Sequence, residues 1–516
     1  MLSDHNCSGI AGFCVVALAC IGREKWIRRR KSKQRADWGE ISARGESMLL
    51  PVFSYMPDLM KSLQDPYHPY TNPRGHITLC VAENKLAIEL IGSRLMQYET
   101  SSRAFSDAAA YCYSNTLGLP GPREAVAYFL AKHFMHPELT DMNVTEALDH
   151  VRPEHVAFGA GAGALVSHLA LSLMDEGDAV LIPAPYYAAF TFDLTILAKS
   201  TVVPVHSPNP SVGPTPDELE NVAASAEAKG LRVRVLLLTN PNNPLGTIYP
   251  PEFVRSSIDW ARNRKIHTIV DEIYALSVRE SGFESVLKTL NGDLRNDVRD
   301  NGFNSYLSNV MQRLNTDNAH TFHFYSFPKV HHVYALSKDF CASGFRIGTL
   351  YTKNQRLLSC VANLNSLSTV SQPMQLIVQD LLTDDNFIYG FLEHTCQRTR
   401  YNYEVCASHL DQMVIPYIPA KAGIFIFADF SSLLPEQTAE GEARFFSLLI
   451  DAAKIILTPG QAQRDRKPGM FRICYAFVSP EVLGIAMQRL DRLVGKIRRC
   501  HDWDNLNAKS LIDIIL

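Results

Sequence analysis

The sequence has little net charge, no closely paired cysteines and few long apolar runs. Each of these absences excludes a class of function or partner. A formal net charge of -3 over 516 residues gives no electrostatic reason to expect a nucleic acid as partner. The 11 cysteines, scattered from Cys7 to Cys500, have neither the spacing of a zinc site nor the density of a disulfide scaffold. We therefore expect no metal site, a small-molecule partner and a reducing compartment such as the cytoplasm.

The one membrane-like feature stands at the N-terminus. An apolar run at residues 7–22 is followed directly by a basic cluster at 23–35. The run is shorter than the roughly 20 residues needed to span a bilayer, although the basic flank suits the cytosolic face of a membrane. The segment is either an anchor with weak membrane association or an extension outside the fold, and in both cases the body of the protein would stay in the cytosol.

What the chain does have is size and a regular alternation of elements. Its 516 residues can hold one large core and at least one smaller domain. From about residue 50, apolar runs of strand length alternate with helix-like stretches, which is typical of an α/β fold whose mostly parallel sheet is flanked by helices. A helix is expected at 164–175. Strands are predicted at 156–158, 179–182, 233–239, 268–270, 333–336, 346–351 and 422–430.

The same pattern predicts the domain organisation. The stretch at about 280–332 has weak periodicity and several Asn and Asp residues, so we interpret it as an insertion in the large domain. The predicted segments are an N-terminal extension at 1–45, the first part of a smaller α+β domain at 46–120, the large domain at 121–355 and the C-terminal small domain at 356–516.

Two turns that follow predicted strands carry groups suited to ligand binding. GAGAGAL at 159–165 opens a helix, where small residues let backbone amides approach an anion and the helix N-terminus adds partial positive charge. NPNNPLG at 240–246 is a rigid turn that can aim one amide side chain into a cleft at the carboxyl end of the sheet. Each segment could also be an ordinary tight turn.

Ionisable side chains follow two further strands. Asp271 ends an apolar strand, where scarce water favours a cationic partner such as a protonated pyridine nitrogen, although Asp is also a common helix N-cap. Lys338 would point into the same crevice, and Arg346, eight residues further on, can return there to bind a phosphate bidentately. Because lysines are usually solvated surface charges, the combination indicates a site more strongly than Lys338 alone.

These segments resemble fold-type-I enzymes that depend on pyridoxal 5′-phosphate (PLP). Their order and intervals are similar to those of the class I/II aminotransferase superfamily, and within it to the 1-aminocyclopropane-1-carboxylate (ACC) synthase-like branch, including its fungal members in secondary metabolism. The resemblance runs from about residue 75 to 478. Its other motifs are GHITLCVAENKLAIELI at 75–91, LGLPGPREAVAYFL at 117–130, DEGDAVLIPAPYYAAF at 175–190, DEIY at 271–274, VYALSKDFCASGFRIG at 333–348 and KPGMFRICYA at 467–476.

The resemblance implies an aspartate aminotransferase-like fold, PLP as cofactor and an α-amino acid as substrate. Lys338 would be the catalytic residue, which holds PLP as a Schiff base and moves protons at the substrate carbon. Asp271 would keep the pyridine nitrogen protonated. Asn243 and Tyr274 would hydrogen-bond the phenolic oxygen of the ring.

The resemblance also implies how the ring and the phosphate are held. Tyr187 would stack on the ring, with the neighbouring Tyr186 as the alternative, and Gly161, Ala162 and Arg346 would hold the phosphate. The family often has threonine where this chain has Ala162, and a hydroxyl residue three positions before the lysine where this chain has an alanine. Phosphate binding would therefore depend more on Arg346 and the helix terminus.

Two residues would contact the substrate. Arg472 would clamp the α-carboxylate bidentately, unless it forms a buried ion pair with a structural acid. Glu83 would lie near the substrate, unless it is a surface carboxylate. The family also implies a homodimer with each site at the subunit interface, reached in ACC synthases by a tyrosine where this chain has Thr116, so Tyr113 is the candidate replacement.

The reaction stays open among those that PLP supports. We favour an aminotransferase, because transamination needs no special leaving group on the substrate. The alternatives are a carbon–sulfur lyase that acts by β-elimination, an ACC synthase, and a catalytically inactive binding protein on the same fold. The lysine, the aspartate and the two arginines argue against the inactive protein.

Overall fold

The computed structural model describes residues 41–49, 51–280, 282–290, 329–500, 503, 506 and 508–516. The predicted membrane anchor at 7–22 and most of the predicted insertion, 291–328, lie outside these residues. In the described ranges, no helix is both long and apolar enough to cross a bilayer.

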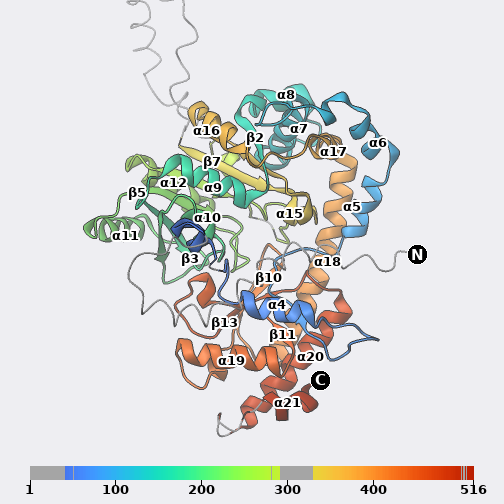
Figure 1. Cartoon of the computed structure of the whole chain (residues 1–516), viewed down its shortest axis with the longest axis vertical. Coiled ribbons are helices and arrows are strands. Elements are labelled where there is room, and N and C mark those ends of the chain that lie inside the picture. The colour runs from blue at the N-terminus through green and yellow to red at the C-terminus, as the bar shows by residue number, and fades with distance from the viewer. Residues whose placement is uncertain are drawn as a thin grey trace, which may run out of the picture.

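A seven-stranded sheet forms the upper body in Figure 1. The order is β2-β8-β7-β6-β5-β3-β4, and all neighbours are parallel except those of β8, which is antiparallel to β2 and β7. The α/β fold with a mostly parallel sheet is therefore confirmed. The strands are β2 (Val156–Gly159), β3 (Ala179–Ala184), β4 (Thr201–His206), β5 (Val233–Thr239), β6 (His267–Asp271), β7 (Val330–Ala335) and β8 (Gly348–Tyr351).

Two details of this sheet differ from the sequence prediction. β4 gave no strand signal, because it is an edge strand with mostly half-buried side chains and a proline, Pro204, inside it. β7 begins at Val330, so the last residues of the predicted insertion at 280–332 belong to the sheet.

Helices cover both faces of the sheet because adjacent residues of its central strands face opposite sides. In β5, Leu236 and Leu238 pack in one core and Val235 and Leu237 in the other. Burial on both faces explains the continuous apolar run of this strand. The first core includes α7 (Pro120–Leu130) and α12 (Pro251–Asn263), and the second includes α9 (Ala162–Leu173) and α16 (Gln355–Asn365).

The lower body is built on a four-stranded antiparallel sheet ordered β12-β13-β10-β9. β1 (Ile77–Thr78) pairs in parallel with β11 (Ile455–Ile456), which joins residues near the N-terminus to this C-terminal body. The strands are β9 (Tyr417–Ile418), β10 (Phe425–Asp429), β12 (Thr458–Pro459) and β13 (Met470–Cys474), and the helices are α4 (Met56–Gln64), α19 (Ala439–Asp451), α20 (Pro480–Arg499) and α21 (Ala508–Ile515).

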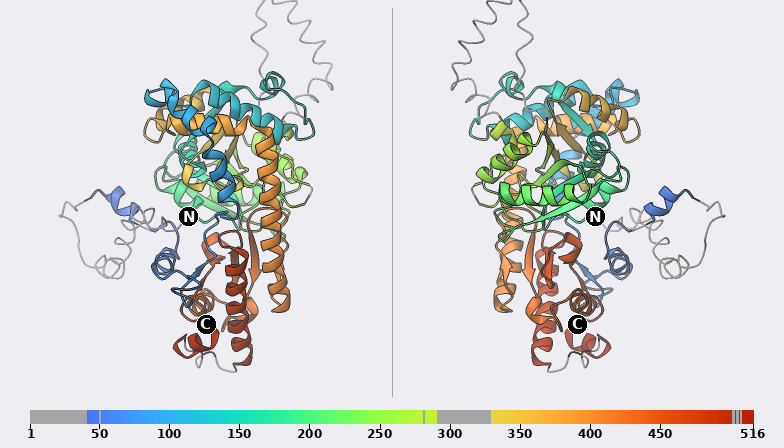
Figure 2. Two further views of the ribbon diagram at one scale, coloured as in Figure 1. Left: turned by 90° about the vertical axis from the view of Figure 1, so that its right-hand side faces the viewer. Right: turned by 90° about the vertical axis from the view of Figure 1, so that its left-hand side faces the viewer.

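One long helix, α18 (Asp385–Gln412), joins the two bodies, as both views of Figure 2 show. Ile388 and Phe391 near its start lie in the core of the large sheet, whereas Cys406 and Leu410 near its end lie in the core of the smaller body. The packed core of the large body therefore continues past residue 355 and ends within α18.

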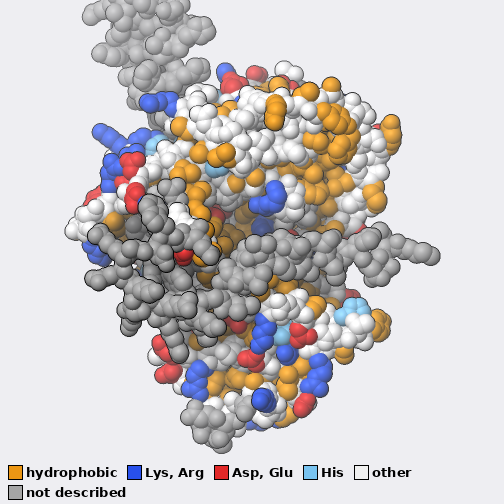
Figure 3. All heavy atoms as spheres, viewed as in Figure 1, with side chains coloured by type: hydrophobic (Ala, Val, Ile, Leu, Met, Phe, Trp, Pro, Cys, Tyr) orange, Lys and Arg blue, Asp and Glu red, His pale blue; other side chains and the backbone are white. Residues whose placement is uncertain are grey.

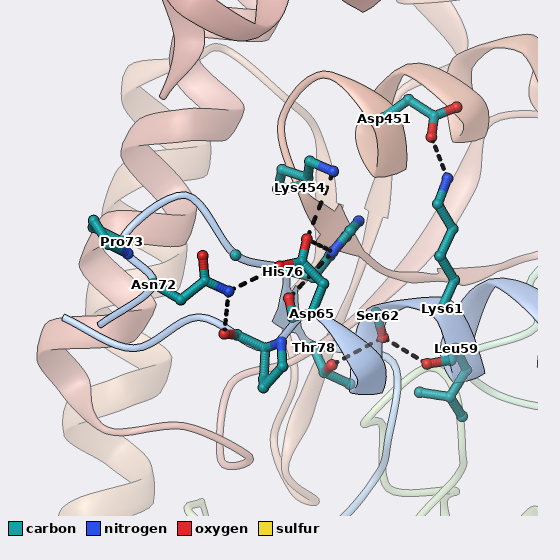
Figure 4. A network of polar contacts seen from close by, with 12 residues as sticks. Leu59, Lys61, Ser62, Asp65, Asn72, Pro73, His76, Thr78, Asp451 and Lys454 are labelled. Atoms are coloured by element: carbon teal, nitrogen blue, oxygen red, sulfur yellow. Dashed lines mark hydrogen bonds and ion pairs between the residues drawn. The ribbon is translucent and has the colours of Figure 1, made fainter. Parts of the chain in front are cut away.

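Polar contacts fix the segment that leads into β1 (Figure 4). Lys61 of α4 lies 2.6 Å from Asp451 of α19. The carboxylate of Asp65 lies 3.1 Å from Nδ1 of His76 and 3.8 Å from the ammonium group of Lys454. These contacts hold the N-terminal segment against the smaller body, from which it continues toward the candidate site.

Candidate active site

The candidate residues meet at the carboxyl ends of three adjacent strands. Asn243, Asp271 and Lys338 follow β5, β6 and β7, which are neighbours in the large sheet. Arg472 of β13 faces them from the smaller body, because its side chain contacts Asn243. The candidate site thus lies between the two bodies, in the crevice where open α/β sheets bind ligands.

Lys338 lies on the single turn α15 (Leu336–Asp339), directly after β7. Its Nζ donates a hydrogen bond of 2.6 Å to the carbonyl oxygen of Ala82. Burial lowers the pKa of Lys338 to about 8. The neighbouring Asp339 accepts a hydrogen bond from the backbone N–H of Leu276, which fixes this turn against the segment that follows β6.

Asp271 ends β6 with 5% of its surface exposed. Its Oδ1 accepts a 3.2 Å hydrogen bond from the backbone N–H of Ile273. Burial raises the pKa of Asp271 to about 7, so a nearby cation would strongly stabilise its ionised form. The adjacent Glu272 is used structurally, because it accepts a 2.6 Å hydrogen bond from Ser285 and lies 3.1 Å from Nε2 of His332.

Asn243 is held by three neighbours. Its Oδ1 accepts hydrogen bonds from Nη1 of Arg472 at 2.8 Å and from Nε2 of Gln463 at 3.3 Å. Its Nδ2 lies 3.5 Å from the hydroxyl of Tyr274. Because two donors hold the oxygen, the NH₂ group is left for Tyr274 and for any acceptor beside it.

Arg472 is buried, with 2% of its surface exposed. Its Nη2 donates to the carbonyl oxygen of Cys80 at 2.6 Å and to the hydroxyl of Thr458 at 3.1 Å. In the part of the chain that the structure describes, its Nε is buried without a hydrogen-bond partner and its contacts are neutral oxygens. The alternative of a buried ion pair with a structural acid is therefore not seen among these residues.

Gly161 and Arg346 form a cradle at the N-terminus of α9. Gly161 has a φ of 89°, and a Cβ atom there would meet Nη2 of Arg346 at 2.5 Å, so this position requires glycine. Arg346 itself has a φ of 55°, and its Nη2 donates to the carbonyl oxygen of Ala160 at 3.2 Å. Ala162 begins the helix, so its backbone N–H is one of those without an intrahelical partner.

The two adjacent tyrosines have different surroundings. Tyr186 is 2% exposed, and its hydroxyl lies 3.4 Å from that of Thr191. Tyr187 is affected by the charges of Asp271 and Arg346, and burial raises its pKa to about 12. Tyr187 is therefore the tyrosine of this pair that faces the candidate site.

Two predicted residues are placed less directly. The carboxylate of Glu83 lies 3.7 Å from the ammonium group of Lys85 and acts on Lys338 through its charge. Tyr113 is fully exposed, so within a single chain it does not line the crevice. Its predicted position across a subunit interface stays a prediction.

Sequence reasoning missed several neighbours of these residues. Gln463 is fully buried, and its Oε1 has no hydrogen-bond partner among the described residues. Thr458 holds Arg472, and the carbonyl oxygen of Ala82 holds Lys338. Gln463 and Thr458 lie outside the motifs named above, so the sequence offered no signal for them. Ala82 lies within the motif at 75–91, but it acts through its backbone carbonyl, which its residue type does not indicate.

The arrangement fits PLP. A cradle of Arg346 and Gly161 suits a phosphate. The charge of Lys338 acts on the buried acid Asp271, yet burial still raises the pKa of Asp271 to about 7, so a cation in contact with it would stabilise its ionised form. Lys338 has the lowered pKa that a nucleophilic amine requires. The unpartnered Nε of Arg472 suits a carboxylate. Within the described ranges, no group of three or more His, Cys, Asp or Glu side chains could hold a metal ion.

Known proteins resemble the chain over most of its length. Residues 93–490 match the family model of aminotransferase class I and II. ACC synthase 2 of Arabidopsis thaliana is 31% identical over 443 residues, 84% of this chain and 81% of that protein. ACC synthase 6 of Oryza sativa subsp. japonica is 28% identical over 88% of this chain and 79% of that protein. A single mutant of aspartate aminotransferase from Thermus thermophilus has the same fold, with a TM-score of 0.66 and 20% identity over 89% of this chain and 100% of that one.

Fold and family together define the class of protein: it is a fold-type-I enzyme that depends on PLP. Within that class, the chain belongs to the class I and II aminotransferase family and to its ACC synthase-like branch.

Proposed function

We propose that this enzyme is an aminotransferase that acts on an α-amino acid. The observation that carries the proposal is the meeting of three groups in one crevice. These are a lysine whose pKa is lowered to about 8, a buried aspartate and a buried arginine with an unpartnered N–H. The lysine would transfer protons, the aspartate would set the charge of PLP, and the arginine would bind the substrate's carboxylate.

Lys338 is proposed as the catalytic base. When bound, PLP takes up the electron pair that is released as the substrate's α-carbon loses its proton. An ordinary lysine, with a pKa near 10.4, would be almost fully protonated at neutral pH and unable to accept that proton. Because burial lowers the pKa of Lys338 to about 8, a useful fraction of the amine is neutral near pH 7. The carbonyl oxygen of Ala82, 2.6 Å away, orients the amine.

Asp271, Asn243 and Tyr274 are proposed to set the charge of the cofactor. A cation next to the buried carboxylate of Asp271 would stabilise its ionised form, so Asp271 would keep the pyridine nitrogen protonated. The NH₂ group of Asn243 and the hydroxyl of Tyr274 lie 3.5 Å apart and would both donate to the phenolic oxygen of the ring. Tyr187 would cover the ring, and Arg346 would hold the phosphate.

Arg472 is proposed to bind the substrate's α-carboxylate. It is fully desolvated in β13, where a charge-assisted pair is stronger than at the surface. Its Nε has no hydrogen-bond partner among the described residues, and its Nη1 donates only to Asn243, so these two nitrogens have N–H groups left for a carboxylate. Glu83 lies next to this region, and we retain it as a substrate-side residue.

The reaction type needs a direct test. Transamination is preferred because it needs no special leaving group on the substrate side chain. The relatives named ACC synthase make ACC synthesis the second candidate. PLP-loaded protein would be incubated with single amino acids and a keto-acid acceptor, and the products measured. Formation of one keto acid per amino acid made supports the aminotransferase. Ammonia with pyruvate would indicate a lyase, and ACC would indicate the synthase.

We also propose that the enzyme works as a homodimer. Figure 3 shows hydrophobic side chains on the face that carries α5 (Ile88–Leu95) and α6 (Tyr98–Ser106). A large exposed apolar surface usually marks an interface. Light scattering would test this by measuring the molar mass of the protein in solution. A mass equal to that of one chain at micromolar concentration would contradict the homodimer. The exposed apolar residues of this region are Ile88, Met96, Tyr98, Phe105, Tyr111 and Tyr113.

A further inference from the structure

Three aromatic rings form a row beside the candidate site. The rings of Phe53 and Tyr55 stack with their centroids 5.2 Å apart and an angle of 11° between their planes. The Phe53 ring also meets that of Tyr187, with 6.5 Å between centroids. Both distances lie within the range of about 4.5–7 Å for aromatic pairs. A residue of the N-terminal segment therefore contacts the ring that is expected to cover the cofactor.

The other end of the row is fixed next to Arg472. Tyr55 is 5% exposed, and burial raises its pKa while the charge of Arg472 opposes that change. Its hydroxyl hydrogen-bonds Thr458, which itself accepts a 3.1 Å hydrogen bond from Nη2 of Arg472. The row thus runs from a hydrogen-bond partner of the candidate carboxylate-binding residue to the candidate cofactor-stacking residue.

This position determines what a substrate side chain would meet. The row runs from Tyr55, whose partner Thr458 holds Arg472, to Tyr187, so the side chain of an amino acid bound by its α-carboxylate to Arg472 would lie next to it. We propose that Phe53 forms the wall of this side-chain subsite, and that the enzyme prefers α-amino acids with an aromatic or large apolar side chain. The proposal rests on the proposed function, because it takes the bound substrate to be an α-amino acid.

The charges near the row argue against a dicarboxylic amino acid. In the described part of the chain, the cations that act on Tyr55 and Tyr187 are Arg472 and Arg346. Both are already assigned, one to the α-carboxylate and the other to the phosphate. The carboxylic acids there are Asp193 and Asp271. Asp271 is assigned to the pyridine nitrogen, and Asp193, whose pKa burial raises to about 7, offers no positive charge to a second carboxylate.

The test compares two substrates on the full-length, PLP-loaded protein. Dissociation constants for L-phenylalanine and L-alanine would be measured from the change in visible absorbance of the cofactor. The natural protein should bind phenylalanine more tightly than alanine. In Phe53→Ala the affinity for phenylalanine should fall about tenfold, as expected for one lost aromatic contact, while that for alanine stays within about twofold. Phe53→Leu, which keeps an apolar wall, should lie between the two.

The controls separate this subsite from folding and from the proposed function. Tyr70→Ala removes an aromatic ring that is 90% exposed and should change neither constant. If Phe53→Ala does not fold, Phe53→Leu decides the matter through the ratio of the two constants. Equal weakening of both amino acids, an unchanged ratio, or tighter binding of aspartate than of phenylalanine would overturn the subsite. A cofactor spectrum that responds to no amino acid would instead refute the proposed function, and the subsite with it.

Discussion

The guanidinium group of Arg472 donates a hydrogen bond to the side-chain oxygen of Asn243, with 2.8 Å between Nη1 and Oδ1. Arg472 belongs to β13 of the smaller body, whereas Asn243 follows β5 of the larger one. The residue proposed to bind the substrate therefore contacts a residue proposed to bind the cofactor. This contact fixes the two bodies relative to each other at the site, and it couples the residue proposed to bind the substrate to one proposed to bind the cofactor.

Arg472→Lys should weaken binding of substrates that carry a carboxylate. Lysine keeps the charge but cannot form the bidentate pair, so the dissociation constant for L-phenylalanine should rise on the order of a hundredfold. Phenylethylamine, which has the same ring and amine but no carboxylate, should bind the natural protein and the variant alike. Spectroscopic titration measures both. An equal loss for the two compounds would show that Arg472 acts on the fold and not on the carboxylate.

Gln463→Leu should raise the pH midpoint at which PLP bound to Lys338 changes its visible absorbance. With one of the two donors to its oxygen removed, Asn243 would aim its NH₂ group less well at the phenolic oxygen. A weaker hydrogen bond to the deprotonated form raises the pH midpoint of the absorbance change, by roughly half a unit. Gln461→Leu, on the same turn, is the matched control. A midpoint that is the same in all three proteins would remove this positioning role from Gln463.

Asp271→Asn should change how the stability of the cofactor-free protein depends on pH. Because burial raises the pKa of Asp271 to about 7, the folded protein holds a proton that the unfolded chain releases near pH 4. The contribution of Asp271 to stability is therefore present below about pH 4 and is lost as the pH rises toward about 7. Between pH 5 and pH 8 the natural protein should lose on the order of 3 kcal/mol more than the variant. Urea unfolding of both proteins measures this, and parallel pH profiles would contradict it.

Asp271→Asn should also be nearly inactive when loaded with PLP, although it should still fold. A neutral amide cannot hold the pyridine nitrogen protonated, and the loss of about 3 kcal/mol of transition-state stabilisation would slow turnover roughly a hundredfold or more. Turnover close to that of the natural protein would refute the role of Asp271.

Arg346→Ala should weaken the binding of PLP through its phosphate alone. Ala162 and Ala335 stand where the family often has hydroxyl residues, so the phosphate depends on this arginine and on the helix N-terminus. The dissociation constant for PLP should rise at least about thirtyfold, as for the loss of a charged hydrogen-bond pair. Pyridoxal, which lacks the phosphate, should bind the variant and the natural protein equally. An equal loss for both compounds would point to damage elsewhere in the site.

The sequence predicted the large sheet well, for a physical reason. Its central strands are buried on both faces, so β5 carries an apolar run at 235–238 and β6 a shorter one at 269–270, ahead of the polar residues Asn240 and Asp271. The edge strand β4 has no such run and was missed. The core of the large body continues past residue 355 through Val370 and Val378 to Phe391 of α18, and this packing has no local sequence signal.

The candidate site was predictable in its motifs but not in its connections. Asn243, Asp271 and Lys338 each stand at a strand end, and that position can be read from the sequence. The contact of Gln463 with Asn243 joins residues 220 positions apart and depends on how the two bodies pack. The same is true of Phe53, which precedes α4 in sequence but lies against Tyr187. No local pattern encodes such pairs.

The role of Lys338 is tested most directly by identifying the side chain to which PLP is bound. PLP-loaded protein would be reduced with borohydride, digested and sequenced by mass spectrometry, with Lys338→Ala treated in parallel. We expect one pyridoxyl-modified peptide in the natural protein, with the label on Lys338, and none in the variant. A label on another lysine, or a colourless protein that carries no label at all, would contradict this role.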